Sequence, residues 1–141
     1  MTKPKSLLLK RVDAYTLTEI LVVLCIIGIL VFLALPNLLP LITKAKSTEA
    51  KLQLEYIQKL EKSYYYEHSK YTSSLSEIGF LQEKLTTESK DGHANYRLDI
   101  TNASVTGFIA KATAVVDFNG NGTFNVWEID QDKNIKEVTP D

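Results

Sequence analysis

The sequence predicts an α+β fold in which one long amino-terminal helix, membrane-spanning in its first half and amphipathic in its second, packs on a small antiparallel sheet. Three observations support this prediction. Residues 20–35 form an unbroken apolar run. Residues 43–68 repeat apolar side chains with a helical period, and segments after residue 94 alternate apolar and polar side chains as strands do. A chain of 141 residues has room for one small domain, so the amphipathic half of the helix should cover the sheet.

The apolar run at 20–35 is best explained as a membrane-inserted helix. As a helix it would be about 24 Å long, and its continuation to residue 42 gives about 35 Å, enough to cross a hydrocarbon core of roughly 30 Å. The run is apolar on every face, which does not fit the core helix of a soluble domain. A cleaved secretory signal also fits poorly, because the residues AYTLTE separate the basic start from the apolar run. Four bases precede the run and three follow it closely, so charge favours a cytoplasmic start only mildly.

Residues 14–30, AYTLTEILVVLCIIGIL, resemble the amino-terminal signature of type IV pilins and type II secretion pseudopilins. The resemblance implies that a membrane-embedded prepilin peptidase cuts between Ala14 and Tyr15, and that the new amino terminus is N-methylated. The family usually has Gly before the cut and Phe after it, where this chain has Ala14 and Tyr15. The implied organisation is a cleaved leader at 1–14, a transmembrane and assembly helix at 15–42, and a periplasmic α+β head of pilin-like fold at 43–141.

Glu19 stands directly before the apolar run, where a charge facing lipid is unfavourable. The resemblance implies an assembly role, in which Glu19 pairs with the Tyr15 ammonium of a neighbouring subunit; such a pair is strongly attractive in a low dielectric. The alternative is a first-turn acid that interacts with the helix dipole and reaches the membrane interface. Pro36 matches the family's helix-kinking proline and should kink or locally melt the helix, and Pro40 should make a second break or end the segment.

The predicted head contains the second half of the helix and three strands. Helical spacing places one apolar stripe over the sheet. Its members are Leu52, Tyr56, Ile57, Leu60 and Tyr64. Residues 74–79 predict a short turn of helix with a capping box, ended by Gly79. Alternation predicts strands at 95–101, 107–117 and 123–130, with alanines on one face of the second strand that would let the helix approach closely.

The segment DFNGNGTFNVWE, at 117–128, matches the calcium-loop pattern D-x-[DN]-x-[DN]-G-x5-E. The candidate ligands are the side chains of Asp117, Asn119, Asn121 and Glu128 and the carbonyl of Thr123. The residues NGNG are also what a tight hairpin requires, so a hairpin between the last two strands is the competing interpretation. The resemblance favours calcium, because major pseudopilins have a calcium site in their carboxy-terminal sheet region; Asp130 and Asp132 are alternative ligands in place of Glu128.

The sequence gives no indication of catalysis or of nucleic-acid binding. It has no G-x-S-x-G, P-loop, H-E-x-x-H or C-x-x-C motif, and its two histidines are isolated from one another. After the first fourteen residues acids outnumber bases, so no basic patch for nucleic acid is expected. We therefore expect a protein that is not an enzyme.

The resemblance implies a subunit of a type II secretion pseudopilus that polymerises through its amino-terminal helix and drives protein export across the outer membrane. Its expected partners are further copies of itself, prepilin peptidase, minor pseudopilins and an inner-membrane assembly platform. Its expected place is the bacterial inner membrane, as a single-pass protein with a periplasmic head that enters a periplasmic filament.

Two alternatives to the pseudopilus remain open at this stage. One is a type IV pilin for adhesion, twitching motility or DNA uptake. Many such pilins close a carboxy-terminal loop with a disulfide, which a chain with Cys25 alone cannot form, so secretion is preferred. The other is a membrane-anchored binding module that does not polymerise.

Overall fold

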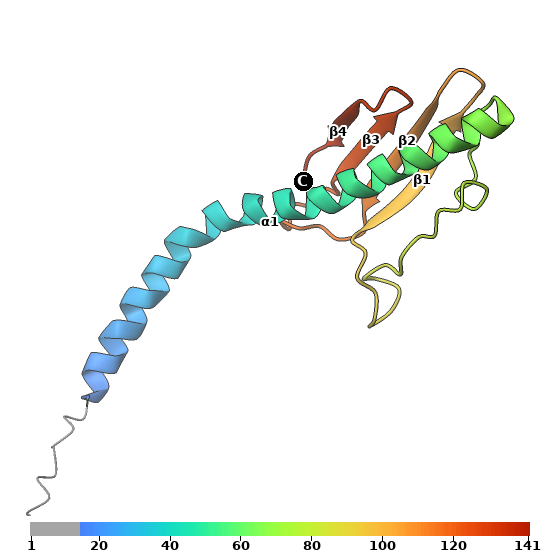
Figure 1. The fold of residues 1–141 in the computed structure, drawn as a ribbon. Helices are drawn as coiled ribbons and strands as arrows, with labels where there is room; N and C mark the ends of the chain where they lie inside the picture. The colour runs from blue at the N-terminus through green and yellow to red at the C-terminus, as the bar shows by residue number, and fades with distance from the viewer. Residues whose placement is uncertain (1–14) are drawn as a thin grey trace, which may run out of the picture. The chain divides into compact units, whose positions relative to one another are not determined.

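The computed structural model describes residues 15–141; the predicted leader at 1–14, including Ala14, lies outside the described residues. The chain divides into two compact units, Met1–Pro36 and Asn37–Asp141. The elements in the described range are helix α1 (Leu17–His68) and strands β1 (Tyr96–Ala103), β2 (Phe108–Ala114), β3 (Val126–Asp130) and β4 (Ile135–Thr139). In the second unit, the later part of α1 packs on a four-stranded antiparallel sheet (Figure 1), which confirms the α+β, pilin-like fold.

Helix α1 continues through both prolines. Each proline lacks the N–H that would close a helical hydrogen bond, but leucines on both sides have high helix propensity. The helix therefore neither melts at Pro36 nor ends at Pro40, which corrects those parts of the prediction. It ends at His68, where Ser69 adopts a left-handed conformation with φ 57° and donates its backbone N–H to the Tyr65 carbonyl at 2.8 Å.

The sheet is a meander in which each strand pairs with the next along the chain, in the order β1-β2-β3-β4. Leu98 of β1 lies opposite Ala112 of β2, which in turn lies opposite Trp127 of β3. The three predicted strands are β1, β2 and β3. The fourth was not predicted, because its short sequence IKEVT has little apolar content; it is the charged edge of the sheet, where charge discourages pairing with other chains.

Two predicted local structures differ from those observed. The residues NGNG do not form a tight hairpin, because the whole of 115–125 connects β2 to β3. Residues 74–79 form consecutive turns rather than a helix, and Gly79 ends them with φ 73°. The Glu77 carboxylate does not close a capping box with Ser74; it accepts hydrogen bonds from the Thr72 hydroxyl at 2.6 Å and the Tyr64 hydroxyl at 3.2 Å.

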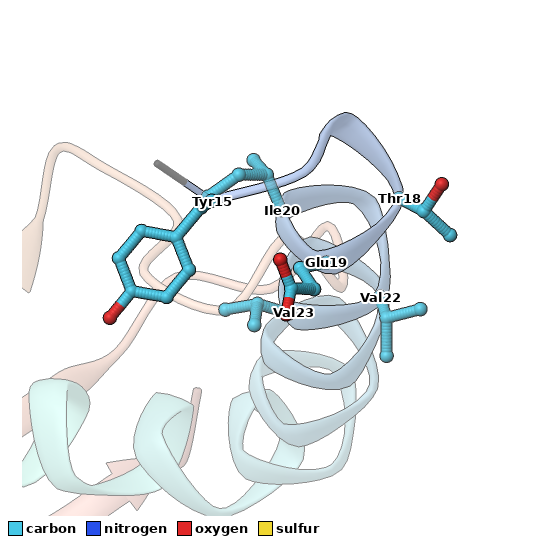
Figure 2. Close-up of a pocket in the computed structure, with 6 residues that line it drawn as sticks. All are labelled: Tyr15, Thr18, Glu19, Ile20, Val22 and Val23. Atoms are coloured by element: carbon cyan, nitrogen blue, oxygen red, sulfur yellow. The ribbon is translucent and has the colours of Figure 1, made fainter. Parts of the chain in front are cut away.

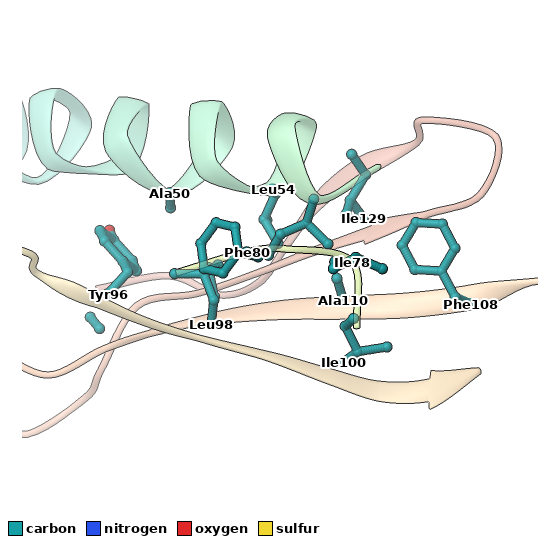
Figure 3. Close-up of a cluster of buried hydrophobic side chains, with 13 residues drawn as sticks. Ala50, Leu54, Ile78, Phe80, Tyr96, Leu98, Ile100, Phe108, Ala110 and Ile129 are labelled. Carbon is teal, nitrogen blue, oxygen red and sulfur yellow. The ribbon is translucent and has the colours of Figure 1, made fainter. Parts of the chain in front are cut away.

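The core of the second unit lies between α1 and the sheet (Figure 3). The helix contributes Ala50, Leu54 and Ile57, and the sheet contributes the following buried residues: Tyr96, Leu98, Ile100, Phe108, Ala110, Ala112, Ala114 and Ile129. The alanines of β2 lie on its buried face, as predicted. The buried face of α1 continues through Thr43, Ser47 and Glu61 and so includes small and polar residues.

The predicted apolar stripe of α1 is therefore wrong in part. Ile57 is buried, and Leu60 and Tyr64 pack partly against the core. Leu52 and Tyr56 are exposed, by 64% and 51%. The prediction placed Leu52 and Tyr56 on the same face as Ile57, whereas the buried face runs through Ala50, Leu54 and Ile57.

Candidate functional site

The first turn of α1 is closed by a capping box between Thr16 and Glu19. Glu19 Oε2 accepts hydrogen bonds from the backbone N–H of Thr16 at 2.7 Å and from its hydroxyl at 2.9 Å. In return the Glu19 backbone N–H donates to the Thr16 hydroxyl oxygen at 3.2 Å. Tyr15, the predicted first residue of the processed chain, thus lies just outside the first helical turn.

Figure 2 shows the residues around a shallow pocket at this end of the helix. Tyr15, Glu19 and Val23 lie toward one side of the helix, and Thr18 and Val22 point to another side. Both hydrogen bonds to the Glu19 carboxylate end on Oε2. The box accounts for Glu19 within a single chain, as the first-turn alternative expects, and its pairing with another subunit stays a prediction.

The apolar part of α1 is exposed on all sides. From Ile20 to Ile42 its large apolar side chains are exposed, with Leu24 at 62% and Phe32 at 75%. The helix is long and apolar enough to cross a bilayer by length and composition. An exposed apolar surface of this extent is unfavourable in water and is typical of a segment covered by lipid or by other chains.

The second candidate site is the loop at 117–123, which folds around the Asp117 carboxylate. Asp117 Oδ1 accepts from the backbone N–H groups of Gly120 at 2.6 Å and Asn119 at 3.2 Å, and Oδ2 accepts from that of Gly122 at 2.7 Å. The bond from Gly122 contributes most to holding the pKa of Asp117 below its ordinary value. Gly120 and Gly122 have φ of 78° and 84°, which favours glycine at both positions.

The two asparagine side chains continue the same pattern along the loop. Asn119 Oδ1 accepts from the Asn121 backbone N–H at 2.8 Å, and Asn121 Oδ1 accepts from the Thr123 backbone N–H at 2.6 Å. The structure thus brings Asp117, Asn119, Asn121 and Thr123 together in one short loop.

Glu128 is placed differently, on the sheet between two lysines. Its Oε1 lies 3.1 Å from Lys111 Nζ on β2, and its Oε2 lies 3.4 Å from Lys136 Nζ on β4. Both carboxylate oxygens are therefore engaged by cross-strand partners. In the described part of the chain, no three His, Cys, Asp or Glu side chains form a group that would hold a metal ion.

Asp130 and Asp132 lie in the turn between β3 and β4. Asp130 Oδ1 accepts from the backbone N–H groups of Asp132 and Asn134, both at 2.9 Å, and Oδ2 accepts from the Asn134 side chain at 2.9 Å. Burial works to raise the pKa of Asp130, but the hydrogen bonds from Asn134 outweigh it and lower the pKa. The structure places these two aspartates in a capped turn of their own, separate in sequence from the loop at 117–123.

Two residues at the end of the loop were missed by sequence reasoning. Asn125 is fully buried: its Oδ1 accepts from the Tyr96 hydroxyl at 2.8 Å and Trp127 Nε1 at 2.6 Å, and its Nδ2 donates to Glu137 at 2.7 Å. Asp141 Oδ2 accepts from the Phe118 backbone N–H at 2.8 Å and brings a second carboxylate to the loop. The contacts of Asn125 with Tyr96 and Glu137, and of Asp141 with Phe118, join residues far apart in sequence, so no local pattern indicates them.

These features define a class of protein: one with an exposed apolar helix before a small α+β head. The sequence is similar to "Type IV major pilin protein PilA" of Myxococcus xanthus (strain DK1622), with 37% identity over 74 residues. The match covers 52% of this chain and 34% of the relative, so the chain spans about a third of the length of the curated relative it matches. No family model matches the sequence. The similarity is thus to a type IV pilin, and it does not distinguish a pilus from a secretion pseudopilus.

Proposed function

We propose that this protein is a structural subunit of a type IV pilin-like filament, stored in the bacterial inner membrane with its head in the periplasm. The observation that supports this most strongly is the apolar helix, exposed on every face up to residue 42, at the amino-terminal side of a folded head. Lipid would cover this surface before assembly, and the same helices of other subunits would cover it in the filament.

Among such filaments, the pseudopilus of a type II secretion system is the first candidate. Cys25 lies in the apolar helix, so the head has no disulfide of its own. Hydrogen bonds that Asp117 accepts, and one that Asn125 donates to Glu137, hold the carboxy-terminal loop instead. Prepilin peptidase, minor pseudopilins and an inner-membrane platform are the partners that this function requires.

A type IV pilus is the second candidate, and one observation favours it. The relative that the chain matches is named a major pilin of type IV. Both candidates use the same helix in the same way, so they differ in what the assembled filament serves.

Calcium binding by the loop at 117–123 forms part of the proposal. Asp117, Asn119 and Asn121 place their side-chain oxygens within one short loop. Gly122 has the positive φ that the sharp turn of a calcium loop needs. Glu128 fits less well, because both of its oxygens face lysines. Asp141, whose carboxylate reaches Phe118, is a better source of a further oxygen than Asp130 or Asp132 in their separate turn. When bound, calcium would neutralise charge and hold the loop to the carboxy-terminal tail.

Assembly is tested by two substitutions in the same capping box. Glu19→Ala should abolish filaments while the protein stays in the membrane, because it leaves the Tyr15 ammonium of the neighbour unpaired in a low dielectric. Thr16→Ala removes the cap at about 1 kcal/mol of helix stability but keeps the carboxylate, so filaments should still form. Filaments sheared from cells are counted by electron microscopy. The control is Glu67→Ala, which removes one exposed acid elsewhere on α1.

Two outcomes would contradict this account of Glu19. Normal filaments from Glu19→Ala would show that the carboxylate is not needed for pairing. If Thr16→Ala and Glu19→Ala reduced the number of filaments equally, the role of Glu19 would be to cap the helix and not to pair with a neighbouring subunit.

A further inference from the structure

The loop at 117–123 contains two consecutive Asn-Gly steps, Asn119–Gly120 and Asn121–Gly122. An Asn-Gly step is chemically labile because glycine has no Cβ to hinder attack by its own backbone nitrogen on the preceding side chain. Asn121 is exposed and Asn119 is half-buried, so both lie within reach of water.

We propose that Asn119 and Asn121 are sites of spontaneous deamidation, and that the Asp117 carboxylate sets the rate at both. The glycine nitrogen gives its proton to water and forms a bond to the Asn Cγ. The bond from Cγ to the amide nitrogen breaks, and this nitrogen takes a proton from water and leaves as ammonia. The product is a five-membered succinimide. Water then opens this ring at either carbonyl and gives aspartate or isoaspartate. Water is the co-reactant, and no oxidation or reduction takes place.

Both attacking nitrogens donate their protons to the same carboxylate. Gly120 N lies 2.6 Å from Asp117 Oδ1, and Gly122 N lies 2.7 Å from Asp117 Oδ2. An N–H held by a carboxylate is harder to deprotonate, because the resulting anion would face a negative charge. Each hydrogen bond must also break before the nitrogen can turn toward the side chain.

The side chains under attack are held as well. Asn119 Oδ1 and Asn121 Oδ1 each accept from the backbone N–H two residues on, at 2.8 Å and 2.6 Å. These bonds hold each side-chain amide against the backbone nitrogen two residues on, whereas the nitrogen that would attack it belongs to the next residue.

The other asparagines of the head provide internal controls. Asn102 precedes Ala103 and Asn134 precedes Ile135, so a Cβ hinders attack at both. Asn95 and Asn125 are buried. We therefore expect modification to concentrate in the loop and to be faster at the exposed Asn121. Each conversion to aspartate adds one negative charge, and conversion at both sites gives the sequence Asp-x-Asp-x-Asp-Gly.

The test is peptide mapping by mass spectrometry of the full-length protein in detergent, sampled during incubation in mildly alkaline buffer. Asp117→Ser keeps one acceptor for the loop but removes the charge and the second acceptor. It should deamidate at Asn119 and Asn121 about tenfold faster than the unaltered protein, the factor expected for loss of a charge-assisted hydrogen bond. Asp130→Ser removes an equivalent charge from the other turn and should leave the rate unchanged.

Equal rates in the unaltered protein and Asp117→Ser would overturn the proposal, as would equally fast modification of Asn102 and Asn134. Faster modification of the buried Asn95 and Asn125 in Asp117→Ser would indicate that the variant has unfolded. In that case, hydrogen exchange of the unaltered protein tests whether Asp117 restrains the two glycine amides. The Gly120 and Gly122 amides should exchange slowly, and exchange at the rate of unprotected amides would refute the restraint by Asp117.

Discussion

At the residue scale, Glu61 is the most unusual group in the head. It is fully buried, its Oε2 accepts from the Thr72 backbone N–H at 3.2 Å, and its Oε1 has no hydrogen-bond partner in the described structure. Burial raises the pKa of Glu61 to about 7, the bond from Thr72 opposes this rise, and the nearby Glu77 carboxylate adds to it. Glu61 is therefore a candidate for pH-dependent stability.

The stability of the head should fall as pH rises from about 4.5 to about 7. Within this window the folded protein holds a proton on Glu61 that the unfolded chain has already lost, so each increase in pH favours unfolding. Glu61→Gln keeps an acceptor for Thr72 without the charge, so it should remove this dependence and stabilise the protein by up to about 3 kcal/mol above pH 7.

Denaturant unfolding at several pH values measures this effect, with the exposed Glu67→Gln as the matched control. Glu67→Gln should follow the unaltered protein at every pH. A Glu61→Gln variant that keeps the full pH dependence would show that Glu61 is not its source.

At the element scale, the structure determines which face of α1 packs against the sheet. Leu54 is fully buried, whereas Leu52, two positions earlier, is 64% exposed. Apart from Gln58, the buried positions of α1 from Thr43 to Glu61 alternate steps of four and three residues. Leu54 and Ile57 are the large apolar side chains that this face of the helix contributes to the core.

The same substitution at two neighbouring leucines tests this register. Leu54→Ala should lower the free energy of unfolding by about 2–5 kcal/mol, because it leaves a cavity in the core. Leu52→Ala should change it by no more than about 0.5 kcal/mol, as at other surface positions. Chemical denaturation of both variants gives the comparison, and equal losses would place the sheet against a different face of α1.

The loop gives a second test at this scale. If calcium binds there, the melting temperature of the protein should rise in calcium and return to its starting value with a chelator. When calcium exceeds its dissociation constant a hundredfold, binding should add about 2.7 kcal/mol to the free energy of unfolding. Asp117→Ser should abolish the shift, and magnesium should not reproduce it. Identical melts with calcium and with chelator would discard the calcium proposal.

Much of the fold follows from periodicity, and the exceptions have physical causes. The apolar run, the long helix and three strands are local patterns and were predicted. Strand β4 is short and charged, so it lacks the apolar alternation that marks a strand. The placement of Glu128 against Lys111 and Lys136, and of Asn125 against Tyr96, depends on strand register, which one sequence does not specify.

At the scale of the whole molecule, two units with different surfaces make up the chain. Met1–Pro36 contains most of the exposed apolar helix, and Asn37–Asp141 buries its own core of helix and sheet. A folded head tolerates an aqueous compartment, whereas the apolar helix requires lipid or other helices. This division agrees with the membrane-held subunit proposed above.

The most direct test is the mass of the mature amino terminus, measured on protein purified from the membrane of cells that contain a prepilin peptidase. Our account predicts a chain that begins at Tyr15 and has a methyl group on its amine. A chain that retains Met1, or one that begins near Leu35 after loss of the apolar helix, would contradict it.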